Sequence, residues 1–115
     1  MRMWMTDVTK MCRQHLLGEH VEHHMFVGAI NKGIDVTGYA TRGLLELINL
    51  QDRHAAIAAE MIRRGYNHHS PLPLLMKTDE LPYQVRHSRV DPIKSTQDLI
   101  TRCPECAALH GANHG

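Results

Sequence analysis

Apolar residues recur at helical spacing in two stretches of the chain. Prolines interrupt the region that follows these stretches. In the first stretch the apolar residues return every three or four positions as far as Asn31, the period of one face of an α-helix. Thr6 or Asp7 supplies a capping oxygen before it, and Gly33 follows its end. The pattern predicts a long first helix whose core face comprises Val8, Met11, Cys12, Leu16, Leu17, Val21, Met25 and Ile30.

A different face of this helix carries polar groups. His15, Glu19 and Glu22 lie four and three positions apart, followed by Phe26 after four more, so the polar side chains line up along one side. On the pattern alone this is a solvated face, with Glu22 paired to Arg13 or to a neighbouring histidine.

A second helix is predicted from about Leu44 or Asn49 to Arg64. Gly65 follows as a left-handed cap, and Arg63 and Arg64 in the last turn suit the negative end of the helix dipole. We expect the connector at residues 33–43, rich in Gly and Thr, to be irregular.

The second half of the chain is divided by prolines, which are absent from residues 1–70. Residues 67–94 therefore look irregular, with a short turn near 74–77. Ser95 or Thr96 can cap a short third helix over residues 97–102, which ends at a turn from Cys103 to Cys106. The chain is predicted to be one compact all-α domain, residues 1–115, of about three helices with long irregular connections.

Composition narrows the class of protein. Hydrophobic residues make up 43% and charged residues 22%, as in a globular domain, and the formal net charge is only +1. Such a balance argues against binding nucleic acid through charge alone. No stretch of 18 apolar residues or secretory signal is visible, and three cysteines are an odd number for a disulfide framework. We expect an intracellular, cytoplasmic protein that neither enters a membrane nor is secreted.

Ten histidines raise the question of a metal. The segment His20-Val21-Glu22-His23-His24 does not match the His-Glu-x-x-His pattern of a zincin. His20 and His24 could still share an ion, with His54 or His68 as a third ligand. This leaves open a metal-dependent hydrolase that uses His20, Glu22 and His24, against the alternative of surface histidines.

The C-terminal tail at residues 103–115 has a second ligand set. Cys103, Cys106, His110 and His114 are four good zinc ligands within twelve residues. The interval between the two pairs is short for a zinc finger. A zinc site in this tail is one interpretation. The alternatives are a turn followed by a tail without metal, and a pair of thiols that oxidise easily.

Two motifs resemble the phage pyrimidine-dimer DNA glycosylases, the endonuclease V family. Gln14-His15-Leu16, followed by Glu19, Glu22 and Val27-Gly28-Ala29, is similar to that family's first helix. The segment at residues 57–67, which ends in Arg-Arg-Gly-Tyr-Asn, resembles the end of its second helix. The resemblance is strongest over residues 1–70.

The resemblance implies a helical enzyme that binds damaged double-stranded DNA and cuts the glycosidic bond of a cyclobutane pyrimidine dimer. Its nucleophile is the N-terminal α-amine, which forms an imine with the sugar C1′, and β-elimination then nicks the backbone. Free α-amines have pKa values of about 7.7–8.0, so a useful fraction is neutral near pH 7. The reaction requires no cofactor, and with this function we expect a monomer that is associated with the nucleoid. Glu22 falls on the catalytic carboxylate, and Arg2, Gln14 and His15 on residues that line the damaged site.

The resemblance also indicates which residue carries the reactive amine. The segment before Gln14 is one residue shorter than in the family, so Met1 itself falls on the nucleophile's position. A bulky Arg2 should prevent removal of Met1. The catalytic pair is thus predicted to be Met1 and Glu22, and the DNA-binding residues Arg2, Gln14, His15, Arg63 and Arg64.

Two arginines of the family's first helix are Val21 and Met25 here, and its aromatic, lysine-bearing tail is replaced by residues 103–115. Fewer cations and aromatic residues imply weaker binding of the duplex or a different lesion. The differences also leave open a helical module that binds DNA without catalysis.

Overall fold

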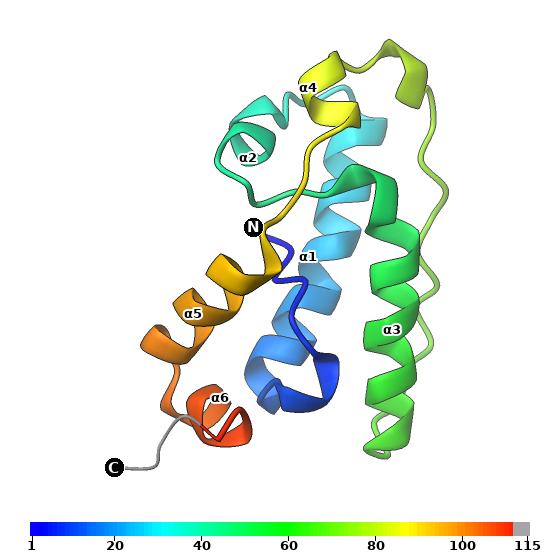
Figure 1. Cartoon of the computed structure of the whole chain (residues 1–115). Helices are drawn as coiled ribbons and strands as arrows, with labels where there is room; N and C mark the ends of the chain where they lie inside the picture. Colours follow the sequence, from blue (N-terminus) through cyan, green and yellow to red (C-terminus); the bar gives the residue numbers. More distant parts are fainter. Residues whose placement is uncertain (112–115) are drawn as a thin grey trace.

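The computed structural model describes residues 1–111, which form six α-helices, three single 3-10 turns and no strand. Figure 1 shows α1 and α3 side by side, with the N-terminal segment laid across α1 and with α5 on its other side. The short helices α2 and α4 cover one end of this pair, and α6 lies at the other. The elements are η1 (Val8–Lys10), α1 (Arg13–Asn31), α2 (Thr37–Thr41), η2 (Leu47–Asn49), α3 (Leu50–Arg63), η3 (Thr78–Glu80), α4 (Tyr83–Arg86), α5 (Pro92–Arg102) and α6 (Pro104–Leu109).

The all-α prediction is confirmed, but the first helix begins later than predicted. The Asp7 side chain accepts the Thr9 N–H and caps only the 3-10 turn η1. Met11 then has extended backbone angles, and Cys12 caps α1 by accepting the His15 N–H on its sulfur. The first helix therefore starts at Arg13, later than Val8, where the apolar pattern of the sequence begins.

The buried face of α1 also differs from the predicted one. Val21 and Met25 are 55% and 50% exposed, whereas Glu19 and His23 are completely buried together with Phe26. His20 is buried as well, so the reading of His20 and His23 as surface residues is wrong. The cause is the partner helix, since α3 offers polar groups to this face.

A buried ion pair joins the two long helices. The Arg53 guanidinium of α3 donates two hydrogen bonds to the Glu19 carboxylate, of 2.7 and 2.8 Å, and a third of 2.6 Å to the carbonyl of Thr6. Glu19 is 0% and Arg53 7% exposed. Two parallel hydrogen bonds to the carboxylate and a further one to a backbone carbonyl offset part of the free-energy cost of burying these two charges.

The predicted end of the second helix is confirmed. Gly65 has φ +83°, and the N–H groups of Gly65 and Tyr66 donate back to Ile62 and Met61 carbonyls, as in a left-handed cap. This helix, α3, starts at Leu50, next to the predicted start at Asn49 and after the separate turn η2, rather than at Leu44.

Three further segments correct the prediction. The Gly/Thr connector contains α2, and the region predicted to be irregular contains η3 and α4. The third helix begins at Pro92, because Asp91 caps it by accepting the Ile93 and Lys94 N–H groups in place of Ser95 or Thr96. The turn from Cys103 to Cys106 is the first turn of α6.

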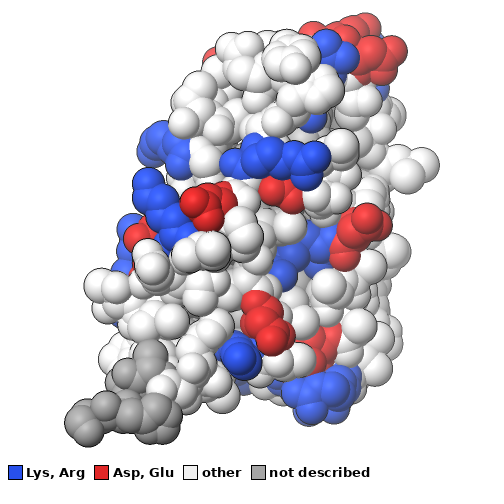
Figure 2. All heavy atoms as spheres, viewed as in Figure 1, with Lys and Arg blue, Asp and Glu red and all other residues white. Residues whose placement is uncertain are grey.

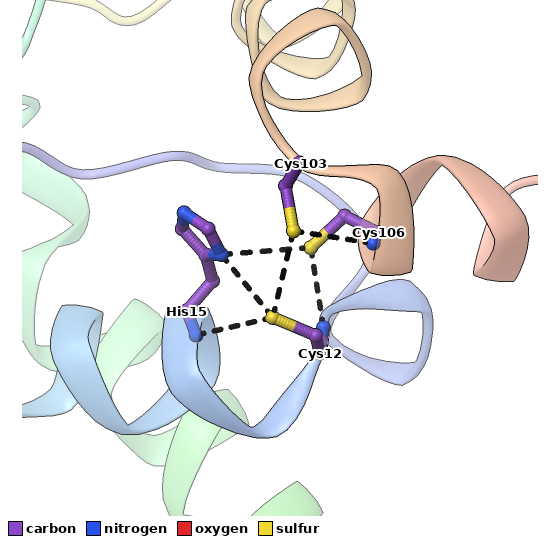
Figure 3. Close-up of side chains that lie close together, drawn as sticks. All are labelled: Cys12, His15, Cys103 and Cys106. Carbon is purple, nitrogen blue, oxygen red and sulfur yellow. Dashed lines mark hydrogen bonds between the residues drawn. The ribbon is translucent and has the colours of Figure 1, made fainter.

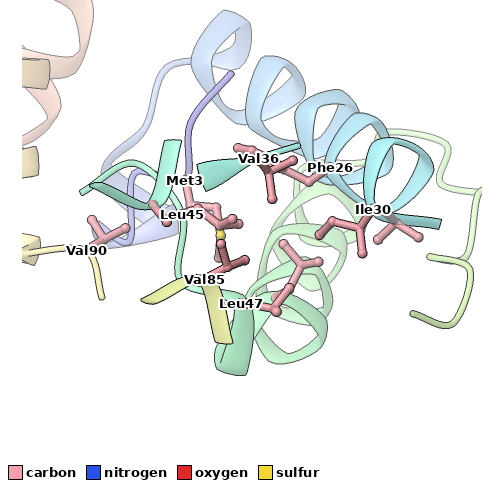
Figure 4. Packing of buried hydrophobic residues seen from close by; sticks show 11 residues of the cluster. Met3, Phe26, Ile30, Val36, Leu45, Leu47, Val85 and Val90 are labelled. Carbon is pink, nitrogen blue, oxygen red and sulfur yellow. The ribbon is translucent and has the colours of Figure 1, made fainter. Parts of the chain in front are cut away.

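Two apolar cores lie on either side of the N-terminal segment. The Met3 core, drawn in Figure 4, surrounds the side chain of Met3 with residues of α1, α2, α4 and the loops between them. The Trp4 core contains Trp4, Leu16, Ile57, Leu99 and the three cysteines. Trp4 is 5% exposed and packs in this core, so it anchors the N-terminal segment. Among the described residues no helix has the length and apolar composition that a bilayer span needs.

Breaking the ion pair should destabilise the fold. Arg53→Met leaves the Glu19 carboxylate buried without its partner, and we expect a loss of about 3–5 kcal/mol in the free energy of unfolding. Urea denaturation measures it. Arg63→Met removes a 63% exposed arginine from another ion pair and should cost less than about 1 kcal/mol. Equal losses in the two variants would contradict this role for the Glu19–Arg53 pair.

Candidate functional site

The N-terminal amine lies beside the carboxylate of Glu22. The Met1 nitrogen is 3.6 Å from Glu22 Oε1, and both residues are partly exposed. Glu22 projects from the middle of α1, while the N-terminal segment is held by a 2.8 Å hydrogen bond from the Met3 N–H to the Leu44 carbonyl. The structure thus brings together the two residues predicted to be catalytic.

A surface hollow opens next to this pair. Its volume is about 500 Å³, and Glu22, His15, Gln14 and Trp4 contribute to its walls. Gln14 is exposed and His15 half-buried. Gln14, His15 and Glu22, which were predicted from the motif of the first helix, therefore line one hollow together.

The side chain of Arg2 contacts Trp4 and helix α5. Its guanidinium lies 3.7 Å from the centre of the Trp4 ring, donates to Ser95 Oγ over 3.4 Å, and stands 3.7 Å from Asp98 Oδ2. Burial lowers the pKa of Arg2, partly offset by Asp98. The side chain thereby connects the N-terminal segment to α5.

Arg2 also belongs to a second hollow that the sequence did not reveal. Arg42, Arg89 and Lys94 line it with Arg2, and Asp91 and Asp98 lie in the same wall. Figure 2 shows basic side chains, with acidic ones among them, on the face that carries the N-terminus. These cations come from separate parts of the chain, so the sequence did not reveal them as one group.

Arg63 and Arg64 lie elsewhere, at the end of α3. Both bind Glu60, and Arg64 also donates to the carbonyls of Val8 and Met11 over 3.0 and 2.7 Å. This places them by the start of α1, whereas Glu22 lies about two and a half turns further along. Arg64 is engaged within the protein, and Arg63 is exposed to solvent.

Two groups of side chains in the described part of the chain could hold a metal ion. One comprises Cys12, His15, Cys103 and Cys106, and the other His20, His54 and His68; within each, the ligand atoms all lie within 4.8 Å of one another. The predicted tail set is thus only half present, since Cys103 and Cys106 meet Cys12 and His15 instead of His110. His114 lies outside the described residues.

The histidine group is tightly packed. The ring centroids of His20 lie 5.0 Å from those of His24 and His54 and 4.8 Å from that of His68. His54 and His68, the two residues predicted as a possible third ligand, both lie in one group with His20. Glu22 belongs to neither group, because it is two positions from both His20 and His24 and so points to another side of α1.

Burial favours the neutral form of three histidines, His20, His23 and His54. It lowers the pKa of His20 and of His54 to about 4, with a further contribution from neighbouring histidines. The pKa of His23 is also lowered to about 4, mainly by burial and partly by Arg53, although its Nδ1–H donates to the Glu19 carbonyl.

Comparison with known proteins adds one finding. A family model described as pyrimidine dimer DNA glycosylase matches residues 1–74, which include α1, α3 and the N-terminal segment. No curated protein and no solved structure matches significantly.

The buried histidines predict a stability that depends on pH. Unfolded histidines bind protons near pH 6.5, whereas His20, His23 and His54 do so only near pH 4, so acid favours the unfolded chain. We expect the free energy of unfolding to be highest above pH 6.5 and to fall by about 1 kcal/mol or more per pH unit between pH 6.5 and 4. Urea titrations at pH 7.5, 6 and 5 with a chelator present test this.

Two variants serve as controls for this prediction. His54→Gln should reduce the pH dependence, whereas His69→Gln, at an exposed position, should leave it unchanged. The Glu60 carboxyl, whose pKa is lowered to about 2 chiefly by hydrogen bonds from Arg63, stays ionised in this range. A flat profile between pH 7.5 and 5 would contradict the prediction.

Proposed function

The chain belongs to the pyrimidine dimer DNA glycosylase family, and we propose that it excises a damaged pyrimidine, a cyclobutane dimer, from duplex DNA and then nicks the backbone. The observation that carries the proposal is the 3.6 Å separation between the Met1 amine and Glu22. A nucleophile and an acid–base group in reach of each other are what linked glycosylase and lyase chemistry requires.

The first step is displacement of the base. The neutral Met1 amine attacks C1′ of the damaged nucleotide, its lone pair forms the C–N bond, and the glycosidic bond breaks with its electron pair leaving on the base. The Glu22 carboxylate takes a proton from the attached nitrogen, and the freed lone pair forms the C=N bond as the C1′–O4′ bond of the sugar breaks. Glu22 passes this proton to the ring oxygen as the ring opens, and the product is the protonated imine.

The second step is β-elimination at this imine. The Glu22 carboxylate, now a base, takes a proton from C2′, and the 3′ phosphate leaves with the electron pair of its C–O bond. One carboxylate close to both C1′ and C2′ can serve as acid and then as base. The chemistry requires no metal, which distinguishes it from the alternative of a metal-dependent hydrolase.

The surroundings of the pair suit a nucleotide. The hollow lined by Gln14, His15, Trp4 and Glu22 offers hydrogen-bonding groups and an aromatic edge to an extruded base. A lesion with weakened stacking and pairing is cheaper to open than an intact pair. Arg2, Arg42, Arg89 and Lys94 supply positive charge beside it for the backbone phosphates. Arg63, exposed at the end of α3, is assigned to a more distant phosphate, and Arg64 to support of the N-terminal segment.

Borohydride trapping on untagged protein tests the nucleophile. With a duplex containing one cyclobutane dimer, we expect a covalent adduct that peptide mapping places on the Met1 amine. Glu22→Gln should lower its yield at least a hundredfold, because removing an acid–base group costs about 10²–10⁴ in rate. Glu80→Gln, at an exposed position in η3, is the matched control and should trap normally.

Other outcomes separate the alternatives. Adduct formation on an abasic site alone would keep the lyase and overturn the dimer as substrate. DNA binding without any adduct would favour a non-catalytic module. Activity lost with a chelator, while circular dichroism shows the fold unchanged, would favour a metal-dependent hydrolase. An added N-terminal residue that leaves trapping on Met1 unchanged would be incompatible with the amine as nucleophile.

The basic hollow predicts a salt-dependent contribution to binding. Arg42→Gln and Arg89→Gln should each weaken binding of undamaged and damaged duplex alike and reduce the slope of log K against log salt by about 1. Fluorescence anisotropy at several salt concentrations measures this slope. Lys32→Gln, at the end of α1 and outside this hollow, is the control. Unchanged slopes in both arginine variants would remove the hollow from the DNA interface.

A further inference from the structure

Three cysteines and a histidine converge where α6 packs against the start of α1 (Figure 3). We propose that Cys12, His15, Cys103 and Cys106 bind a zinc ion that fastens α6 to α1. The inference is independent of the proposed reaction, and its ligand set differs from the one confined to the C-terminal tail.

The four residues form two pairs with the same spacing. Cys12 and His15 are separated by two residues, as are Cys103 and Cys106, and each first cysteine caps the helix on which its partner lies. The pairs are 91 positions apart in the chain, so only the tertiary fold brings them together. Two such pairs facing each other are a common way to build a closed structural zinc site.

The distances fit one tetrahedral ion. Zinc bonds of about 2.3 Å to sulfur and about 2.0 Å to nitrogen place sulfur atoms about 3.8 Å apart and sulfur about 3.6 Å from nitrogen. Cys12 Sγ lies 3.9 Å from Cys103 Sγ and 3.2 Å from His15 Nδ1, and Cys106 Sγ lies 3.8 Å from the same nitrogen. A cluster of several metal ions would hold its ligands on different ions and so further apart.

The surroundings support thiolate ligands. Cys12, Cys103 and Cys106 are 5%, 9% and 0% exposed. Each sulfur accepts a backbone N–H: Cys12 from His15, Cys103 from Cys106, and Cys106 from Cys12, over 3.2–3.4 Å. Zinc would displace three protons from the thiols to solvent, and the site with a neutral histidine would carry a charge of −1. The three N–H donors offset part of that charge.

The half-buried His15 completes the set from the edge. Its Nδ1 faces the sulfurs, while the other ring nitrogen points away from them in Figure 3. With four protein ligands and no open position, the ion would have a structural rather than a catalytic role.

Metal analysis of untagged protein, purified under reducing conditions after growth with zinc, tests the site. Since His20, His54 and His68 could take a second ion, sulfur ligation is read from cobalt(II) exchanged for zinc. We expect the sulfur-to-cobalt charge-transfer band of three thiolates and the visible bands of a tetrahedral ion. A histidine-only site gives no such charge-transfer band, so its absence in the wild-type protein would overturn the proposal.

Variants identify the ligands. Cys12→Ser and Cys103→Ser should each lose the charge-transfer band or reduce it by about a third, whereas His110→Gln should keep it in full. Loss of the band in His110→Gln with an unchanged band in Cys12→Ser would assign the ion to the tail and overturn this ligand set. A wild-type protein that shows a disulfide by mass spectrometry and takes up no cobalt after reduction would overturn the site altogether.

Discussion

Arg53 extends from α3 to Glu19 in the middle of α1 and, with the same guanidinium, to the carbonyl of Thr6. A fully buried carboxylate needs this partner, so the spacing and rotation of the two long helices are set by a charge interaction as much as by apolar packing. Arg64 makes a similar connection further along, to the carbonyls of Val8 and Met11. Two arginines of one helix thus hold the N-terminal segment against the other.

This constraint positions the candidate site. The segment held by Arg53 and Arg64 runs back along α1, and its first residue reaches Glu22. Because Arg2 is in turn attached to α5, the amine lies where three parts of the chain meet, with one hollow beside α1 and another between α2 and α5. A nucleophile on a chain end can be positioned in this way only when its own segment is part of the core.

Local patterns in the sequence predicted elements whose signals are local. The left-handed cap at Gly65 is one example. The start of α1 was misplaced because Asp7, the better capping residue, caps only the short turn η1, whereas Cys12 caps α1 itself. Glu19, His20 and His23 looked solvent-exposed because their partners lie on α3, more than thirty residues away.

The same limit applies to the sites. The family resemblance pointed to Met1 and Glu22, which the fold brings together. The tail motif pointed to Cys103 and Cys106, but spacing along the tail could not reveal Cys12 and His15 at the other end of the chain. Nor does any local pattern in the sequence show that Arg2, Arg42, Arg89 and Lys94 line one hollow.

Met3 and Trp4 are neighbours in the chain, yet their side chains belong to different cores. Opening either core would pull the same short segment out of the other, so the two halves of the molecule should melt as one cooperative unit. Chain ends usually fray at little cost in free energy. Here amide hydrogens at the N-terminus, such as that of Met3, should exchange with solvent only through global unfolding, at rates normally seen in the middle of a domain.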